Sequence, residues 1–262
     1  MDPSALSGTD GGPRSGGGYQ RQHRRTLLEK NILKPWQVKS WCVPIITPLF
    51  LQRMEAILAL YHQPYNPKRP MVNFDEKSVQ LLDEVRPGRA CRPGHARRQD
   101  YEYKRHGTRN LFMFVEPKAG YRQVVVTQQR TKRDFAQAIR YLVDGVYPQA
   151  EMIDVVLDNL NTHHVHSLIE HFGKVEADRL MSRVCFHFTP PHGSWLNMAE
   201  IELSVLSRQC LDRRLPDEMT LTTEILAWET RRNGRHKPFT WTFTVDDARR
   251  VFRDAYSSPS PN

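Results

Sequence analysis

Hydrophobic and polar positions alternate with two different periods along this chain, and the changes of period mark the expected elements. Helical spacing governs "LFLQRMEAILALYHQP" and "TKRDFAQAIRYLVDGVYP", so both stretches are expected to be amphipathic helices. The first presents Leu51, Met54, Ile57, Leu58 and Tyr61 on one face, and the second presents Phe135, Ile139, Leu142 and Val143. Shorter helical patterns cover "HVHSLIEHF", about 221–233 and about 245–256.

Short apolar runs bounded by turn residues predict five strands. They are "MVNFDEKSVQLL", "RNLFMFVEP", "YRQVVVTQQ", "MIDVVLDNL" and "VCFHFTPP". The "KAG" between the second and third suits a hairpin turn, and the fourth has the composition of a central strand that is covered on both faces. Three strands followed by alternating helices and strands indicate a mixed α/β sheet.

Composition divides the chain into four expected regions. Residues 1–22 form a Gly/Ser-rich leader expected to be disordered, and 23–68 form a basic arm that ends in the first amphipathic helix. The main α/β domain is expected over 69–256, and 257–262 form a disordered tail.

The formal net charge of +9 and the pI near 9.5 favour a polyanionic partner such as nucleic acid, although a merely basic protein has the same balance. The chain has no run of 18 apolar residues and no apolar core of a signal peptide, so a cytoplasmic protein without a membrane partner is expected. The four cysteines form no C-x-x-C pair, which argues against a disulfide framework or a structural zinc site.

Three acids fall at the ends of expected elements: Asp75, Asp158 and Glu200. If the first and fourth strands are neighbours, Asp75 and Asp158 come together, and the helix after the fifth strand can bring Glu200 to them. Clustered carboxylates repel one another unless a cation is present, and hard divalent cations prefer oxygen ligands. Taken singly, each acid also fits a structural role, as a strand-end turn residue, a helix cap or a first-turn acid.

Residues 85–109 carry eight Lys or Arg against two acids. A basic loop beside the first acidic strand suits phosphate contacts, through Arg92, Arg97, Arg98, Lys104 and Arg105. A solvated flexible loop is the alternative. Tyr101 and Tyr103 fit either stacking on bases or core packing.

Several residues near the acids are candidates for supporting roles. His163 and His164 follow Asp158 and can contact a phosphate or orient a carboxylate, and His192 precedes the last helix at a position that can approach a phosphate. Trp195 and Leu196 are expected to anchor that helix in the core. Asn197 lies three residues before Glu200, so we expect it to support the site or contact DNA.

The motifs "FDEKSVQLL", "LDNLNTHH" and "FHFTPPHGSWLNMAEIELSVLSRQCL" resemble the three acidic motifs of DDE transposases, in the bacterial insertion-sequence branch of the mariner superfamily. The resemblance covers roughly 24–256. It implies an RNase H-like five-stranded sheet flanked by helices, with catalytic, metal-binding residues Asp75, Asp158 and Glu200. Glu202 does not match the motif position.

The resemblance also implies a chemistry and partners. These are two Mg²⁺ ions (Mn²⁺ as substitute) that support cleavage at transposon ends and strand transfer into target DNA at TA sites, by a homodimer in a bacterial nucleoid. Relatives carry a helix-turn-helix region before this domain, where this chain has the Gly-rich leader. The 41 residues of 159–199 are also a longer gap than is typical, and "EHFGKVEADRLMSR" is expected to extend the helix before the fifth strand.

Two alternatives to an active transposase stay open. One is a transposase remnant that binds DNA without cutting it, and the other is a different RNase H-like nuclease, for example one that cuts RNA–DNA hybrids. A two-carboxylate glycosidase explains neither the basic charge nor the third acid.

Overall fold

The computed structural model describes residues 46–160 and 163–257. The expected leader over 1–22, the first part of the basic arm, and residues 258–262 of the expected tail lie outside the described residues. No helix within the described ranges combines the length and the apolar character that a bilayer crossing requires.

The core of the protein is one five-stranded mixed sheet in the order β3-β2-β1-β4-β5, which confirms the expected fold class. The strands are β1 Met71–Glu84, β2 Tyr103–Glu116, β3 Tyr121–Thr127, β4 Ile153–Leu157 and β5 Val184–Phe188. β1, β2 and β3 pair antiparallel, while β1–β4 and β4–β5 pair parallel. β4 lies between two neighbours and all five of its residues are buried, as its unbroken apolar run predicts.

The first strand is longer than its sequence pattern predicts. It does not end at the acids but continues to Glu84, and it pairs with β2 from Asn73 onward. Its parallel pairing with β4 covers only Met71–Asn73. Asp75 therefore lies inside a strand, two residues past the last pairing with β4, where one edge of β1 is free of its parallel neighbour.

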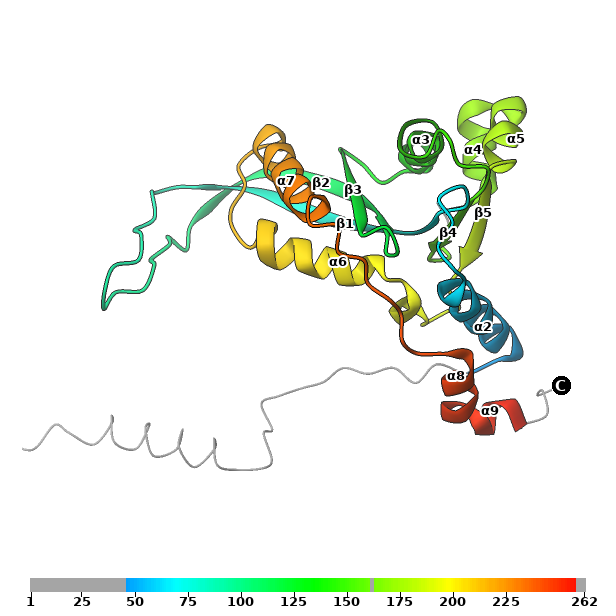
Figure 1. Cartoon of the computed structure of the whole chain (residues 1–262). Coiled ribbons are helices and arrows are strands. Elements are labelled where there is room, and N and C mark those ends of the chain that lie inside the picture. Colours follow the sequence, from blue (N-terminus) through cyan, green and yellow to red (C-terminus); the bar gives the residue numbers. More distant parts are fainter. Residues whose placement is uncertain (1–45, 161–162, 258–262) are drawn as a thin grey trace, which may run out of the picture. The chain divides into compact units, whose positions relative to one another are not determined.

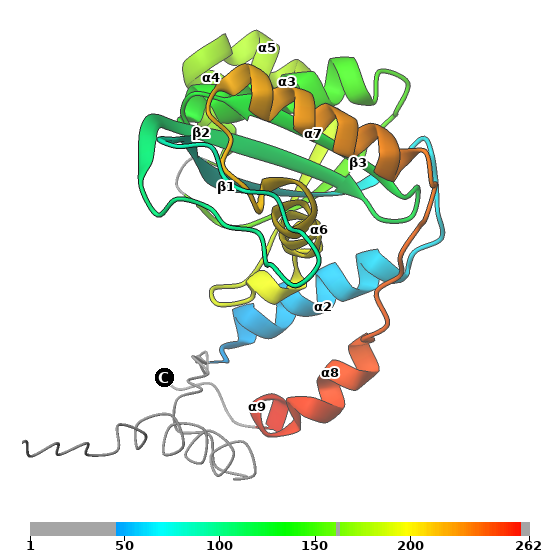
Figure 2. The ribbon, with the colours of Figure 1, turned by 90° about the vertical axis from the view of Figure 1, so that its left-hand side faces the viewer.

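Helices cover both faces of the sheet (Figures 1 and 2). They are α2 Pro48–His62, α3 Lys132–Tyr141, α4 Val165–Phe172, α5 Lys174–Met181, α6 Ala199–Leu206, α7 Glu218–Asn233, α8 Val245–Val251 and α9 Arg253–Ser257. One hydrophobic core joins α3, α4 and α5 to the face of β1 and β2 that carries Phe74 and Phe112. A second core joins α6 and α7 to the opposite face, which carries Leu81 and Met113.

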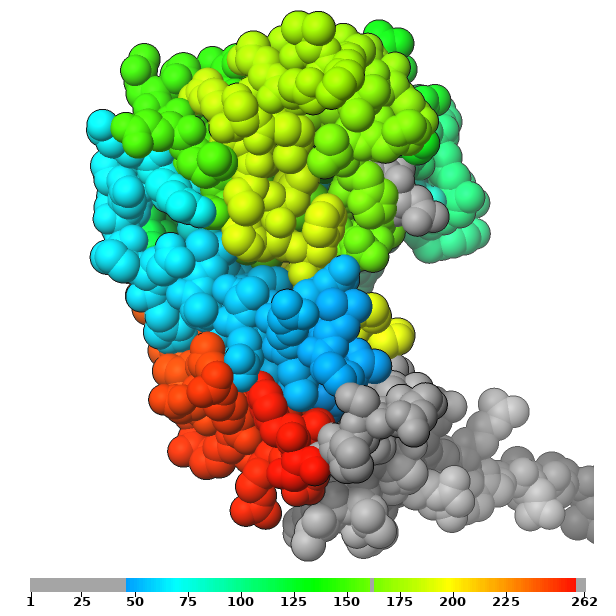
Figure 3. Space-filling view, turned by 90° about the vertical axis from the view of Figure 1, so that its right-hand side faces the viewer, coloured from blue at the N-terminus to red at the C-terminus, as the bar shows by residue number. Residues whose placement is uncertain are grey.

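Helix α2 belongs to a third core, together with β4, the turn before α6, and α8. The five residues expected on its apolar face are all buried, so that expectation is confirmed. Its N-terminus is capped by the Thr47 hydroxyl, which accepts a hydrogen bond from the Phe50 N–H. Figure 3 shows α2 between β5 and the C-terminal helices, and it contacts both β5 and α8.

Two other segments differ from the sequence-based expectation. The extra residues before β5 do not extend α4: the chain turns at Gly173, with φ 81°, and starts a separate helix, α5. A positive φ favours glycine, which explains why the apolar pattern breaks there. The basic segment 85–109 is not all loop either, because 103–109 belong to β2.

Candidate active site

The alternation of β1 separates its two neighbouring acids. Successive side chains of a strand point to opposite faces, so Asp75 and Lys77 face α6, and both line a surface cleft with Glu200. Glu76 lies on the opposite side with Phe74, and it contacts Arg130 and His163 there. Only Asp75 of this pair is therefore placed on the face that α6 covers.

The turn that leads into α6 is fixed by close backbone packing. The Gly193 N–H donates to the Pro190 carbonyl at 2.8 Å. A Cβ on Gly193 would lie 2.5 Å from the Pro190 ring, so no other residue fits there without displacing it. His192, at the tip of this turn, is exposed and has φ 60°. The sequence places it just before the helix that carries Glu200, and the structure exposes it at the surface.

Two buried asparagines join this turn to β1. The Asn197 amide donates to the Phe74 carbonyl at 2.8 Å, and its side-chain oxygen accepts from the Ala199 N–H at 3.1 Å. The Asn73 side-chain oxygen accepts from the Met198 N–H at 3.1 Å. These bonds fix the start of α6 against the strand that carries Asp75.

The structure corrects the expectations for two residues of this turn. Asn197 precedes α6 rather than sharing a helical face with Glu200, and it is only 3% exposed, so its side chain supports the turn. Trp195 is 40% exposed and stacks on Trp241 at 6.2 Å instead of entering the core. Leu196 is fully buried, as expected.

Tyr61 of α2 also contacts the junction between β1 and the turn before α6. Its hydroxyl lies 2.6 Å from the side-chain oxygen of Asn73 and 2.5 Å from the Leu196 carbonyl. Burial raises the pKa of this hydroxyl, which therefore stays a neutral donor. Helix α2, which the sequence grouped with the basic arm, thus contacts the residues that position α6.

The two acids of α6 lie in different environments. Glu200 is exposed and lines the cleft with Asp75. Glu202 is only 3% exposed, and its carboxylate forms ion pairs with Arg122 at 3.0 Å and Arg232 at 2.7 Å. The roughly 200° between positions two apart on a helix explains the separation. Glu202 is a buried structural carboxylate, and Glu200 is the acid that faces solvent.

Asp158 follows the last residue of β4 and its side chain is held by a histidine. His163 Nδ1 lies 2.6 Å from Asp158 Oδ1, and its Nε2 lies 3.3 Å from Glu76 Oε2. Burial alone lowers the pKa of His163, but its hydrogen bonds to Asp158 and Glu76 and their charges outweigh burial and raise it to about 9. His163 therefore carries positive charge beside Asp158 at neutral pH.

The charges of the three acids act on one another at Asp75. Burial, offset in part by the Glu76 N–H and reinforced by the negative charges of Glu200, Asp158 and Glu76, raises the pKa of Asp75 to about 7. Such a cluster of carboxylate oxygen donors matches the ligand preference of a hard divalent cation. Asp75, Asp158 and Glu200 are therefore the residues that fit a bound Mg²⁺ or Mn²⁺.

The basic residues of the hairpin between β1 and β2 are open to solvent, and Figure 1 shows this hairpin projecting from the sheet. Among the described residues, none of its five candidate DNA contacts forms an ion pair with a carboxylate: Arg92, Arg97, Arg98, Lys104 and Arg105. Arg109, by contrast, pairs with Glu218 at 2.6 Å. Tyr101 and Tyr103 are 83% and 42% exposed, so neither is a core residue.

The family model for the DDE superfamily endonuclease matches residues 70–222, which is more than half of the chain. The chain belongs to the DDE superfamily endonucleases. The matched range contains Asp75, Asp158 and Glu200, although the match itself assigns no role to them. A search of curated protein sequences finds no match.

The DDE endonuclease is also similar in fold to solved Mos1 mariner transposase structures. A Mos1 paired-end complex with the left transposon end aligns with a TM-score of 0.50 and 14% identity, over 83% of this chain and 66% of that one. A pre-cleavage Mos1 transpososome aligns with a TM-score of 0.50 and 13% identity, over 93% and 71%. The chain thus spans about two thirds of the Mos1 length, and the similarity establishes the RNase H-like fold.

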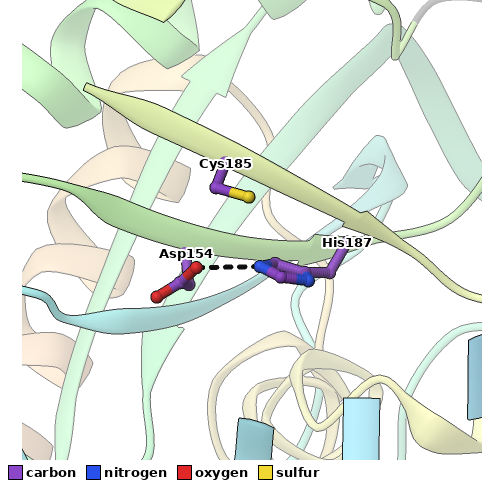
Figure 4. Close-up of side chains that lie close together, drawn as sticks. All are labelled: Asp154, Cys185 and His187. Atoms are coloured by element: carbon purple, nitrogen blue, oxygen red, sulfur yellow. Dashed lines mark hydrogen bonds and ion pairs between the residues drawn. The ribbon is translucent and has the colours of Figure 1, made fainter. Parts of the chain in front are cut away.

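A second polar cluster lies at the other end of the parallel strands of this endonuclease (Figure 4). Ligand atoms of Asp154, Cys185 and His187 lie within 4.8 Å of one another, and they form the one such trio of possible metal ligands that the described residues contain. Sequence reasoning missed this cluster because its members come from β4 and β5. Cys185 and His187 are alternate residues of one strand, and that spacing is the only local signal.

The bonds within this cluster favour a structural role over a metal site. Arg69 donates to both oxygens of Asp154, at 2.6 and 3.0 Å, and His187 Nε2 lies 2.8 Å from Oδ1. A metal ion would have to displace the guanidinium and compete with its charge. Burial alone raises the pKa of Asp154, but the bonds from His187 and Arg69 outweigh burial and lower it to about 2.

This depressed pKa gives a pH-dependent prediction for stability. Because the folded pKa of Asp154 lies below its usual value, its contribution is present above about pH 4 and is lost as the pH falls toward 2. The free energy of unfolding of wild type, measured in urea, should therefore fall by about 2 kcal/mol between about pH 4 and pH 2. Asp154→Asn should not show this loss. Asp178→Asn, at an exposed carboxylate of α5, should keep the wild-type slope; equal slopes for all three proteins would refute the role of Asp154.

The two acids of α6 should respond oppositely to neutralisation. Glu202→Gln removes the charge that balances two buried or half-buried arginines and should lower the free energy of unfolding by about 3–5 kcal/mol. Glu200→Gln removes a repelling charge at an exposed position and should change it by less than about 0.5 kcal/mol in metal-free buffer. Chemical denaturation of both variants measures this difference, and a similar loss in both would contradict the separation of the two acids.

Proposed function

We propose that this DDE endonuclease is the catalytic domain of a transposase of the bacterial insertion-sequence branch of the mariner superfamily. It cleaves DNA strands at transposon ends and joins the resulting 3′-OH to target DNA. The observation that carries this proposal is the convergence of Asp75, Asp158 and Glu200, from β1, the end of β4 and α6, where the charges of the other two act on Asp75. The similarity of fold to Mos1 transposase supports the choice of a transposase within the family.

The three carboxylates would hold two Mg²⁺ ions, for which Mn²⁺ would substitute. Asp75 would hold the metal together with Asp158 and Glu200, whose negative charges both act on it. In the described part of the chain, the ligand atoms of these three residues do not all lie within 4.8 Å of one another. Two bound ions of this kind activate a water or a 3′-OH for attack on phosphorus and stabilise the leaving oxygen.

The residues of the chain serve this reaction by binding and orientation. Asn73 and Asn197 hold the start of α6 against β1, so Glu200 meets Asp75 in a fixed arrangement. Lys77 and Arg208 line the same cleft and supply positive charge for the phosphate backbone. The reaction needs no covalent intermediate on a side chain of the site, because the attacking group comes from water or DNA.

DNA binds along the basic surface of the β1–β2 hairpin. Arg92, Arg97, Arg98, Lys104 and Arg105 contact backbone phosphates, and His192 approaches the scissile strand from the turn before α6. The substrates are transposon terminal inverted repeats and target DNA at TA sites, and the active form is a homodimer on DNA. Recognition of the repeats depends on whether a helix-turn-helix region accompanies this domain.

A cleavage assay tests the proposal directly. Wild-type protein with Mn²⁺ and a duplex carrying relatives' terminal repeats should produce nicks at the repeat ends. Replacing any one of Asp75, Asp158 and Glu200 by its amide should lower the rate by roughly 10²–10³-fold, since each ligand contributes several kcal/mol to charge stabilisation. Asp83→Asn, at another half-buried acid of β1, is the matched control and should cut normally.

The outcomes separate the candidate functions. Joining of a DNA 3′-end into a second duplex is specific to a transposase, whereas hydrolysis of RNA–DNA hybrids alone would indicate another RNase H-like nuclease. DNA binding without any cleavage would identify a non-catalytic remnant. Activity that survives loss of the acids would remove the basis of the proposal.

The salt dependence of DNA binding tests the role of the hairpin. A triple Arg92, Arg97 and Arg98→Ala protein should bind duplex DNA more weakly, with a slope of log K against log salt that is shallower by about 2–3. Fluorescence anisotropy in Ca²⁺ measures this slope without cleavage. The matched control is a triple substitution of Arg179, Arg249 and Arg253, because Arg179 and Arg249 are paired on surfaces away from the hairpin and Arg253 lies in α9; an equal change there would indicate only net charge.

A further inference from the structure

A buried histidine connects the second acid of the site to the strand that carries the first. His163 is only 1% exposed, and both of its ring nitrogens lie within hydrogen-bond distance of carboxylates, Asp158 at 2.6 Å and Glu76 at 3.3 Å. Carboxylate oxygens only accept hydrogen bonds. With one ring nitrogen at each carboxylate, the ring forms a bridge between β1 and the segment after β4.

The anchor on β1 is itself fixed. Glu76 is nearly buried, and its other oxygen forms an ion pair with Arg130 at 3.1 Å. Strand alternation directs the Glu76 side chain to the face opposite Asp75, where it contacts Arg130 and His163. The two neighbouring acids of β1 thus reach the site in different ways, one directly and the other through an imidazole.

The imidazole ring has little freedom to move. It packs edge-on against Phe74, with ring centroids 5.3 Å apart, and against Phe135 at 4.8 Å. Both phenylalanines are fully buried in the core between the sheet and α3. A ring that is held by two aromatic contacts and two hydrogen bonds can fix the orientation of a less constrained carboxylate bonded to it.

Asp158 is such a carboxylate. It is the first residue beyond the end of β4, so no strand pairing fixes its backbone. Among the described residues, His163 is the one hydrogen-bond partner of its side chain. Without that bond, the carboxylate would be free to rotate away from Asp75.

We propose that His163 is a positioning residue: anchored by Glu76, it holds Oδ1 of Asp158 and so sets the orientation in which this carboxylate meets a divalent cation. The inference rests on the proposed function, because it assumes that Asp158 is a metal ligand. Outer partners that orient ligating carboxylates are typically worth about 10–100-fold in metal affinity. Glu76 acts one step further away, through the ring.

Metal binding measured without catalysis tests this role. Free Mn²⁺ is titrated by electron paramagnetic resonance with the full chain and no DNA, for wild type, His163→Ala, His163→Asn and Glu76→Ala. His163→Ala should weaken Mn²⁺ binding by about 10–100-fold. His163→Asn should recover most of that loss, since its amide nitrogen replaces the ring Nδ1 as donor to Asp158. Glu76→Ala should fall between wild type and His163→Ala.

A matched control separates positioning from general destabilisation. Glu229→Gln alters another buried carboxylate, which accepts from the Val124 N–H on α7's side of the sheet and does not contact the acids of the site. It should change thermal stability but not Mn²⁺ affinity. Normal Mn²⁺ affinity in His163→Ala, or equal weakening in His163→Asn and His163→Ala, would overturn the assignment of His163 while leaving the proposed function intact. A wild-type chain that binds no Mn²⁺ would overturn both.

Discussion

The burial of Asp75 among other carboxylates is the constraint on which the site depends. Asp75 sits half-buried on β1, and the charges of Glu200 and Asp158 reach it from two other elements. Clustering carboxylates costs free energy that a folded chain recovers only by protonation or by binding a cation. The buried carboxylates of Glu202 and Asp154, by contrast, are balanced by arginine or histidine.

The surrounding structure keeps the repelling groups together. The bonds of Asn73 and Asn197 hold the start of α6 against β1, and Tyr61 of α2 joins both sides of that junction. His163 provides the corresponding contact for Asp158. Each anchor is neutral or cationic, so none adds to the negative charge it restrains. The repulsion between the carboxylates is opposed by these buried hydrogen bonds, because breaking one would leave a buried polar group without a partner.

Much of this arrangement could be predicted from local sequence patterns. The five strands, their mixed sheet, the apolar face of α2 and the separation of Glu200 from Glu202 all follow from period and spacing. The family match then confirms that the chain is a DDE superfamily endonuclease. The metal-binding roles of the three acids remain a proposal, because a sequence motif identifies the residues but not their chemistry.

What sequence patterns missed depends on contacts between distant residues. The length of β1 is set by its pairing with β2. The mostly polar residues 75–80 do not predict this pairing. The sequence around Asn197 does not indicate whether its side chain is buried or exposed. Its burial follows from its hydrogen bonds to Phe74 and Ala199. The trio of Asp154, Cys185 and His187, and the bridge from Glu76 to Asp158, join residues 33 or more positions apart at their widest, so neither has a contiguous motif.

The position of bound manganese tests the central claim most directly. Crystals of the full chain grown with Mn²⁺ and measured near the manganese absorption edge would locate the ions by anomalous scattering. The account predicts peaks beside Asp75, with Asp158 and Glu200 as the other protein ligands, and none at Asp154, Cys185 and His187. Peaks at the second cluster with none at Asp75 would contradict it.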